Sequence, residues 1–216
     1  MFRPFFRALS KIPDGKDYTN LYRGNSKASS LRRKNLELYL KLMDSYKPEV
    51  LLLGEAPGYK GARLTGLPFS CEDLVFGKIE HPVFGLEKGY ERWAKAKLEK
   101  ERSAHMVWNE LGKYKELPLI WNIFPFHPHH EDKILSNRSP RISELRIGQP
   151  FVSRLLKLFP IQRIGAIGQK AYKGLSEMSL ENYELRYIRH PSYGGKADFV
   201  KGLGEFLNPL AQAPPP

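Results

Sequence analysis

Three side chains capable of acid–base or hydrogen-bond chemistry stand at the ends of short runs of mostly apolar residues. Glu55 closely follows the run Val50–Leu53, and Asn122 lies inside the run Leu119–Phe124. His190 comes just after a more polar run near the C-terminus. A carboxylate can act as a general base, an amide offers both a donor and an acceptor, and an imidazole can donate a hydrogen bond. If the runs are parallel strands, ligands bind beside the loops that leave their carboxyl ends.

The first of these loops, Gly54–Ser70, is rich in glycine and reads GEAPGYKGARLTGLPFS. Its glycines let the backbone approach a ligand closely, and Pro57 stiffens the turn. Glu55 stands where a general base could be held, and Phe69 could present its ring to a flat ligand. The alternative is an ordinary connection in which Glu55 caps a helix and Phe69 belongs to the core. No Gly-Lys-Ser or Gly-Lys-Thr closes the loop, so it is not a Walker loop.

The second loop, Asn122–Arg141, combines an amide in an apolar setting with a group of potential metal ligands. An unpaired amide there costs about 1–3 kcal/mol, so either the backbone satisfies Asn122 or a ligand does. Arg138 and Arg141 are candidates for phosphate contacts, with a solvated loop as the alternative. The residues that resemble a metal cluster are His127, His129, His130, Glu131 and Asp132. Neighbouring histidines in a proline-containing loop seldom converge on one ion.

The third loop, His190–Lys196, reads HPSYGGK. Ser192 and the amides around its two glycines could hold a phosphate, and Tyr193 could stack on a base or act as a wedge. A histidine in this position is otherwise a structural residue. The loop therefore has the composition of a nucleic-acid contact.

Apolar runs alternate with helical patterns along most of the chain. The predicted strands are Val50–Leu53, Leu119–Phe124, Arg163–Ile167 and Tyr183–Ile188. The predicted helices are Ser29–Tyr46, Tyr90–Lys113, Ser143–Phe159, Gln169–Glu177 and Asp198–Leu207. Runs without polar alternation are typical of strands buried on both faces, and the more polar fourth run suits an edge. We expect an α/β fold, a three-layer α/β/α sandwich with a central, mainly parallel four-stranded sheet.

The composition favours a polyanionic partner. The chain has 216 residues, with 35 Lys and Arg against 23 Asp and Glu, a formal net charge of +12. Nucleic acid is the default partner of such a chain, and no long apolar run predicts a membrane span. The single cysteine, Cys71, excludes an internal disulfide and any site that needs four cysteines, and it fits a reducing cytosol.

The chain divides into an arm, one domain and a tail. We expect residues 1–27 to form a basic N-terminal arm whose Phe2, Phe5 and Phe6 pack on the domain. Residues 28–210 form a single domain, and residues 211–216 form a flexible tail. We expect a cytoplasmic, nucleoid-associated monomer with no obligate protein partner.

The three loops Gly54–Ser70, Asn122–Arg141 and His190–Lys196, in this order along the chain, resemble those of the uracil-DNA glycosylase superfamily. The resemblance extends over about Val50 to Leu207. The marks are the Gly-Glu-Ala-Pro-Gly segment Gly54–Gly58, the segment Gly66–Phe69, Asn122 at a strand end, and His190-Pro191-Ser192. The first segment is similar to the branch with a Gly-Glu-(Gly/Ala)-Pro-Gly motif. That branch usually holds an iron–sulfur cluster on four cysteines, which this chain lacks. Ala56 matches the position where other members carry an aspartate.

The resemblance implies an enzyme that flips a deaminated base, uracil first, out of DNA and hydrolyses its N-glycosidic bond without a metal or organic cofactor. It implies that Phe69 stacks on the base, Asn122 reads its imide edge, His190 stabilises the departing base, and Glu55 or its loop positions water. The implied substrate-binding residues are Gly54, Ala56, Pro57, Gly58, Phe69 and Asn122. The candidate DNA contacts are Ser192, Tyr193, Lys196 and Arg138, with Arg32 and Arg33 added because of their charge.

Several alternatives stay open. Hypoxanthine or xanthine could be further substrates, the DNA could be single- or double-stranded, and the wedge residue is undefined because Tyr193-Gly194-Gly195 replaces a leucine-type wedge. A non-catalytic nucleic-acid-binding protein of the same fold is the second hypothesis. A metal-dependent hydrolase that uses the cluster His127–Asp132 is the third.

Overall fold

A four-stranded parallel sheet forms the centre of the computed structural model, which describes residues 1–92 and 97–208. The strands are β2 (Val50–Gly54), β3 (Leu119–Asn122), β5 (Arg163–Ile167) and β6 (Glu184–Ile188), in the order β3-β2-β5-β6. The inner strand β2 is buried throughout, whereas the edge strand β6 is largely half-exposed. This arrangement confirms the predicted fold class and the edge position of the most polar run.

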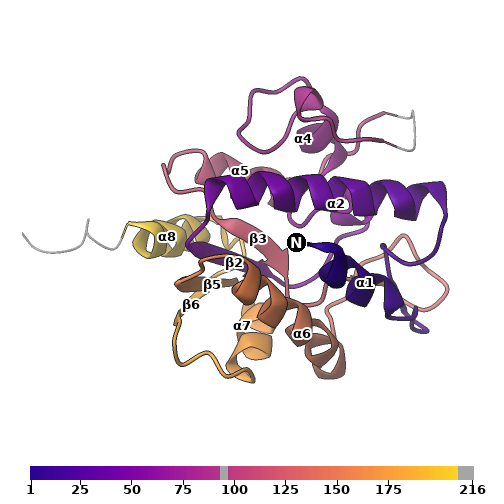
Figure 1. Ribbon diagram of the computed structural model, residues 1–216. Helices are drawn as coiled ribbons and strands as arrows, with labels where there is room; N and C mark the ends of the chain where they lie inside the picture. Colours follow the sequence, from indigo (N-terminus) through magenta and orange to yellow (C-terminus); the bar gives the residue numbers. More distant parts are fainter. Residues whose placement is uncertain (93–96, 209–216) are drawn as a thin grey trace, which may run out of the picture.

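Helices cover both faces of the sheet (Figure 1). One face carries α2 (Lys27–Tyr46), α5 (Arg102–Leu111) and α8 (Lys196–Leu207). The opposite face carries α1 (Arg3–Lys11), α6 (Ile142–Leu158) and α7 (Gln169–Ser176). The crossover from β2 to β3 runs in one direction across the sheet, and the crossovers from β3 to β5 and from β5 to β6 run in the other. Right-handed crossovers that run in opposite directions lie on opposite faces, so α5 is separated from α6 and α7.

Local signals explain where two of the helices begin. The Ser26 hydroxyl caps α2 by accepting the Ser29 N–H at 3.1 Å. Helix α6 begins after Arg141, whose backbone N–H donates to the Glu144 carboxylate at 2.7 Å. Both contacts satisfy polar groups that a helix end would otherwise leave unpaired.

The region between β2 and β3 departs from the expected pattern. The predicted helix Tyr90–Lys113 is wrong in its first part, because α5 begins only at Arg102 and the described residues 97–100 are not helical. Part of that prediction, residues 93–96, lies outside the described residues, as does the predicted tail. Sequence patterns also missed the short elements α3 (Ala62–Thr65), α4 (Glu72–Phe76), the 3-10 helix Leu86–Lys88, and the antiparallel pair β1 (Tyr18–Thr19) and β4 (His127–Pro128).

The N-terminal segment packs into the same core as the sheet. Phe2 and Phe5 are buried and Phe6 is half-buried. The Phe5 ring lies edge-on to Trp121 of β3 at 5.5 Å and to Phe151 of α6 at 6.0 Å between centroids. The segment is therefore an integral layer of the fold.

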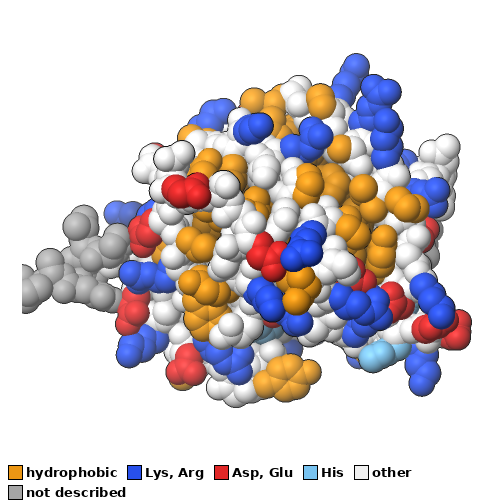
Figure 2. Space-filling view, turned by 90° about the horizontal axis from the view of Figure 1, so that it is seen from below, with side chains coloured by type: hydrophobic (Ala, Val, Ile, Leu, Met, Phe, Trp, Pro, Cys, Tyr) orange, Lys and Arg blue, Asp and Glu red, His pale blue; other side chains and the backbone are white. Residues whose placement is uncertain are grey.

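Positive charge is spread widely over the surface. Figure 2 shows Lys and Arg side chains scattered over the face that α6 and α7 cover, between acidic and apolar ones. Among the described residues, no helix combines the length and the hydrophobicity that a membrane span requires. Net charge alone thus does not locate a binding surface. The hydrogen bonds and ion pairs of each Lys and Arg show which of them could contact a ligand.

Candidate active site

A cleft of about 740 Å³ opens where β2, β3, β5 and β6 end. It contains most of the residues singled out by their position in the sequence: Glu55, Ala56, Pro57, Gly58, Phe69, Asn122, Arg138, His190, Ser192 and Tyr193. Parallel strands bring these loops together although they lie up to about 140 residues apart. The cleft is the candidate active site.

Asn122 and Phe69 meet above Gly54 at the floor of the cleft. Asn122 ends β3, and its side chain is buried yet makes no hydrogen bond with any residue that the structure describes. A Cβ atom on Gly54 would lie 2.0 Å from the Phe69 ring and 2.8 Å from Asn122 Oδ1. Gly54 therefore acts by leaving room for these two side chains and does not itself line the cleft.

The backbone holds Phe69 in an unusual conformation. Its φ angle is +44°, a region that non-glycine residues rarely adopt. The indole N–H of Trp108 donates to the Phe69 carbonyl at 2.7 Å and fixes this turn. The half-buried ring faces His190, with 6.1 Å between ring centroids. Such strain persists only where surrounding contacts enforce it, and it is common at functional sites.

The hydrogen bonds of His190 define its tautomer. The backbone N–H of Ser192 points at Nδ1, with a nitrogen–nitrogen distance of 3.2 Å, and the Ser192 hydroxyl lies 2.7 Å from the same atom. Because a backbone N–H can only donate, Nδ1 accepts and the neutral ring carries its proton on Nε2. Burial lowers the pKa of His190, Glu101 raises it, and Arg189 lowers it. The histidine is therefore a neutral donor at pH 7.

Glu55 sits between β2 and the beginning of α7. Its carboxylate accepts the backbone N–H of Lys170 at 3.3 Å, and a Cβ atom on Gly168 would lie 2.7 Å from its Oε1. Burial raises the pKa of Glu55, while the hydrogen bond and the charge of Lys170 lower it. The positive end of the helix dipole also favours a carboxylate at this position. A carboxylate with a raised pKa is suited to accept a proton from water.

The predicted DNA contacts fall into different environments. Ser192 and Tyr193 line the mouth of the cleft, and Tyr193 is 97% exposed in a left-handed conformation with φ +51°. Lys196 is exposed at the start of α8, outside the cleft lining. Tyr193 is thus presented to solvent, whereas Lys196 does not line the cleft.

Arg138 does not lie free for phosphate, contrary to the sequence-based prediction. Its guanidinium donates to both oxygens of Glu144 at 2.7 and 2.5 Å and to the backbone oxygen of Asp17 at 2.9 Å. Only 10% of its side chain is exposed. Its neighbour Arg141 also pairs with the carboxylate of Asp17. Arg138 therefore supports one wall of the cleft from inside the protein.

The histidine-rich loop also serves the fold. The two ring nitrogens of His127 face the carbonyls of Pro57 and Ile134 at 2.8 and 3.0 Å. Those of His129 contact the His130 carbonyl and the Thr19 hydroxyl. Within the described part of the chain, no three metal-ligand side chains converge. These contacts do not support the metal-dependent hydrolase hypothesis.

The structure adds cleft residues that the sequence did not reveal. They include Glu101, Ser103, Asn137, Gly168, Gln169, Tyr187 and Arg189. Gln169 follows the third apolar run, so the rule that ligands bind at strand ends could have found it. Glu101 lies in the long connection between β2 and β3, where no pattern marks it; its carboxylate caps α5 by accepting from the Ser103 and Ala104 N–H groups at 3.0 and 2.8 Å.

The cleft coincides with a region of family similarity. A sequence model described as the Uracil DNA glycosylase superfamily matches residues 40–210. A comparison with curated proteins finds no match. The family match covers well over half of the chain, including all four strands of the sheet and every predicted cleft residue. The chain belongs to the uracil DNA glycosylase superfamily.

Proposed function

We propose that this protein is a DNA glycosylase that takes a uracil nucleotide out of the DNA stack and hydrolyses its N-glycosidic bond. The observation that carries the proposal is that Asn122, Phe69 and His190 line one cleft together. It offers an unpaired amide, an aromatic face and a neutral N–H donor to the same ligand. A planar imide base matches all three groups.

Each group has a distinct task in this reaction. The Asn122 amide accepts from the N–H of uracil and donates to a carbonyl, whereas cytosine presents the reverse pattern at that edge. The Phe69 ring packs on the base, and base–aromatic stacking contributes about 1–3 kcal/mol. Nε2–H of His190 donates to the base oxygen on which negative charge develops as the bond breaks.

Glu55 supplies the base for the water. As the bond between the sugar C1′ and the base nitrogen breaks, its electron pair leaves with the base as an anion. The water oxygen then bonds to C1′, and Glu55 takes the water proton. The products are the free base and an abasic site. The hydrogen bond from the Lys170 N–H to this carboxylate supports the assignment.

The test is excision from oligonucleotides that contain one uracil, single- and double-stranded, followed by cleavage at the abasic site. We expect His190→Ala to slow single-turnover excision by roughly 10²–10³, the effect of removing one preorganised donor to a developing anion. DNA affinity should barely change, because phosphate contacts dominate it. His130→Ala is the matched control, since this histidine is exposed and outside the cleft lining.

The result also separates catalysis from binding. A wild-type protein that binds DNA but releases no base from uracil, hypoxanthine or xanthine substrates contradicts the proposal and favours a nucleic-acid-binding protein of the same fold. Wild-type rates in both His190→Ala and Glu55→Gln mean that other residues carry the chemistry.

A further inference from the structure

Residues of the loop Gly54–Ser70 form a glycine-rich wall of the cleft. Two arginines beside this wall lack an acidic partner among the described residues. Arg32 lies near the beginning of α2, and Arg63 lies in α3 next to Ala62, which lines the cleft. Burial and the nearby charge of Arg63 together lower the pKa of Arg32 to about 10, although Tyr22 acts in the opposite direction. Among the described residues, no carboxylate acts on the pKa of either arginine. Two like charges therefore lie close together without compensation.

Their hydrogen bonds are incomplete as well. Nε of Arg32 is enclosed and has no acceptor in the described part of the chain. Nε of Arg63 donates to the backbone oxygen of Tyr59 at 3.0 Å, which leaves the two terminal nitrogens of that guanidinium. A partly buried charge without its partners is destabilising. An anion bound beside both guanidinium groups would compensate both charges at once.

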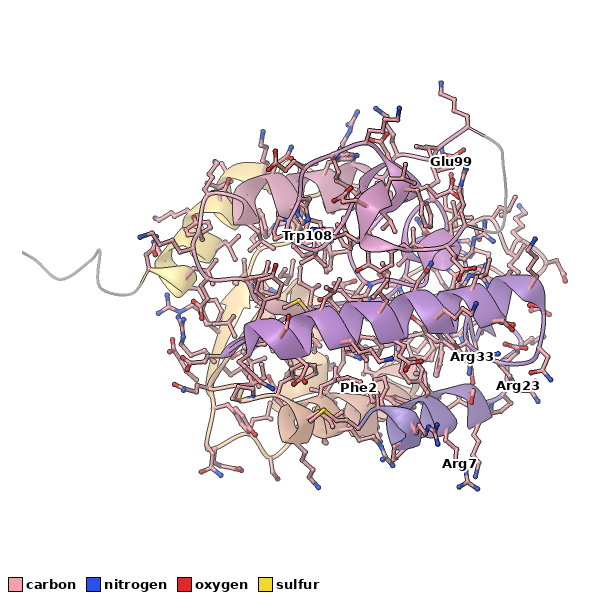
Figure 3. All side chains as sticks on the ribbon, turned by 45° about the horizontal axis from the view of Figure 1, so that its top comes forward. Phe2, Arg7, Arg23, Arg33, Glu99 and Trp108 are labelled. Carbon is pink, nitrogen blue, oxygen red and sulfur yellow. The ribbon has the colours of Figure 1, made fainter. Side chains whose placement is uncertain are left out.

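Neighbouring arginines are satisfied within the fold. Figure 3 shows Arg23 and Arg33 near the beginning of α2. Arg33 donates to the backbone oxygens of Tyr22 and Gly24 at 2.6 and 2.7 Å, and Arg23 lies 3.8 Å from Asp14. Arg33 is thus not a free phosphate contact, although its charge predicted one. Arg32 differs from these two neighbours, because its enclosed Nε has no acceptor among the described residues.

The position of the pair relates it to the cleft. Helix α2 leads directly into β2 and runs back along it, so its first turns lie towards the end of the sheet where the cleft opens (Figure 1). Gly66 packs directly against the Arg32 side chain and precedes Phe69 by three residues. A strand whose base reaches Phe69 would bring its backbone near this wall.

We propose that Arg32 and Arg63 together bind one backbone phosphate of the DNA strand that enters the cleft. The inference rests on the proposed function for the identity of the strand, while the anion site itself follows from the two uncompensated guanidinium groups. Guanidinium groups suit this task because their N–H donors match the spacing of phosphate oxygens. Sequence analysis pointed to Arg32 by charge alone and did not find Arg63.

The test measures binding of a uracil-free single strand, so it requires no excision. Arg63→Gln and Arg32→Gln should each weaken binding about 5–10-fold at low salt and reduce the slope of log K against log[salt] by roughly 0.7, the value for one phosphate of a single strand. The double variant should lose little more than either single one, because both arginines hold the same phosphate. Arg154→Gln removes an equal charge from the exposed surface of α6 and should bind as the wild type does.

Two results overturn the inference. The first is a folded Arg63→Gln protein with wild-type affinity and salt slope; this variant decides if Arg32→Gln does not fold. Stabilisation of the wild type by inorganic phosphate at constant ionic strength would in that case assign the pair to a free anion. The second is full additivity of the two substitutions.

Failure of this site is distinguishable from failure of the proposed function. Uracil excision by the wild type, together with unchanged DNA binding by Arg63→Gln, removes the phosphate site and leaves the glycosylase. Weakened binding by that variant, without excision by the wild type, retains the phosphate site and removes the glycosylase.

Discussion

The side-chain amide of Asn122 presents an acceptor and a donor to the cleft, and no described residue occupies them. Replacing the amide with a carboxylate leaves two acceptors and changes the pattern that faces the base. We expect Asn122→Asp to lower uracil excision by at least about 10² and to admit cytosine, because sites built to pair polar groups discriminate strongly. Excision assays on otherwise identical uracil and cytosine strands check this. Full uracil activity in both Asn122→Asp and Asn122→Ala would make the residue structural.

The protonation states of His190 and Glu55 predict an acid limb in the rate. Protonation of Nδ1 removes the acceptor of the Ser192 N–H, so the neutral histidine is the active form. Burial lowers its pKa below the ordinary 6.5, and burial raises the pKa of Glu55 above the ordinary 4.5. The single-turnover rate should be flat near pH 7–8 and fall only below the ordinary histidine range. A Glu55→Gln protein should retain only the decrease in rate that is due to protonation of His190. A wild-type rate that stays unchanged down to pH 4 would contradict both assignments.

The sequence predicted which side chains at strand ends line the cleft better than it predicted which cations are available to bind phosphate. Glu55, Asn122 and Phe69 reach the cleft because local chain direction decides where they point. The role of Arg138 depends on Asp17, which lies 121 residues away, and no local pattern encodes that partner. That no carboxylate among the described residues acts on Arg63 is equally a result of tertiary packing.

The first turn of α7 positions Glu55, and the space for its carboxylate exists because residue 168 has no side chain. Gly168 also has φ +96°, which strains any other residue. We expect Gly168→Ala to displace the carboxylate and lower the excision rate about 10-fold or more, since misplacement by 1 Å can cost 10² in rate. Gly202→Ala in α8, whose new methyl group would meet Ile188 of β6 at 3.7 Å, should retain wild-type rates. Equal rates in the two variants would show that Glu55 does not need this position.

The bounds of helices and strands could be predicted from the sequence where hydrophobic periodicity was strong. The run Arg163–Ile167 is β5 without a shift, and α6 differs from its predicted range by one residue at each end. The connection from β2 to β3 was poorly predicted because its short elements are held by tertiary contacts. One such contact is the pair of hydrogen bonds from Arg92 to the Glu72 carboxylate, both at 2.9 Å.

Three buried or half-buried histidines affect the stability of the whole molecule. Burial lowers the pKa values of His81, to about 4, and of His127 and His190. In the unfolded chain these side chains titrate near 6.5, so between that pH and the folded pKa the unfolded state binds more protons. The free energy of unfolding should therefore be highest above pH 6.5 and decrease as the pH falls towards 4.

Urea denaturation between pH 7.5 and 4.5 measures this decrease. Nδ1 of His81 accepts the N–H groups of Val83 and Phe84, both at 3.1 Å, and Asn can supply an acceptor at the same place. His81→Asn should reduce the decrease, because it removes one group that takes up a proton on unfolding. An identical pH dependence in the variant would show that His81 titrates normally.

The family match begins at residue 40, but the buried apolar core includes residues far earlier in the chain. Phe2 and Phe5 complete the apolar layer over Trp121 and Phe151, and Asp17 anchors Arg138 in the cleft wall. A fragment cut at the family boundary would expose that layer to water and leave Arg138 without one of its two acidic partners. We expect such a fragment to aggregate on expression, so excision assays on it would report misfolding. The boundary of the family match and the boundary of the apolar core are therefore different places in the chain.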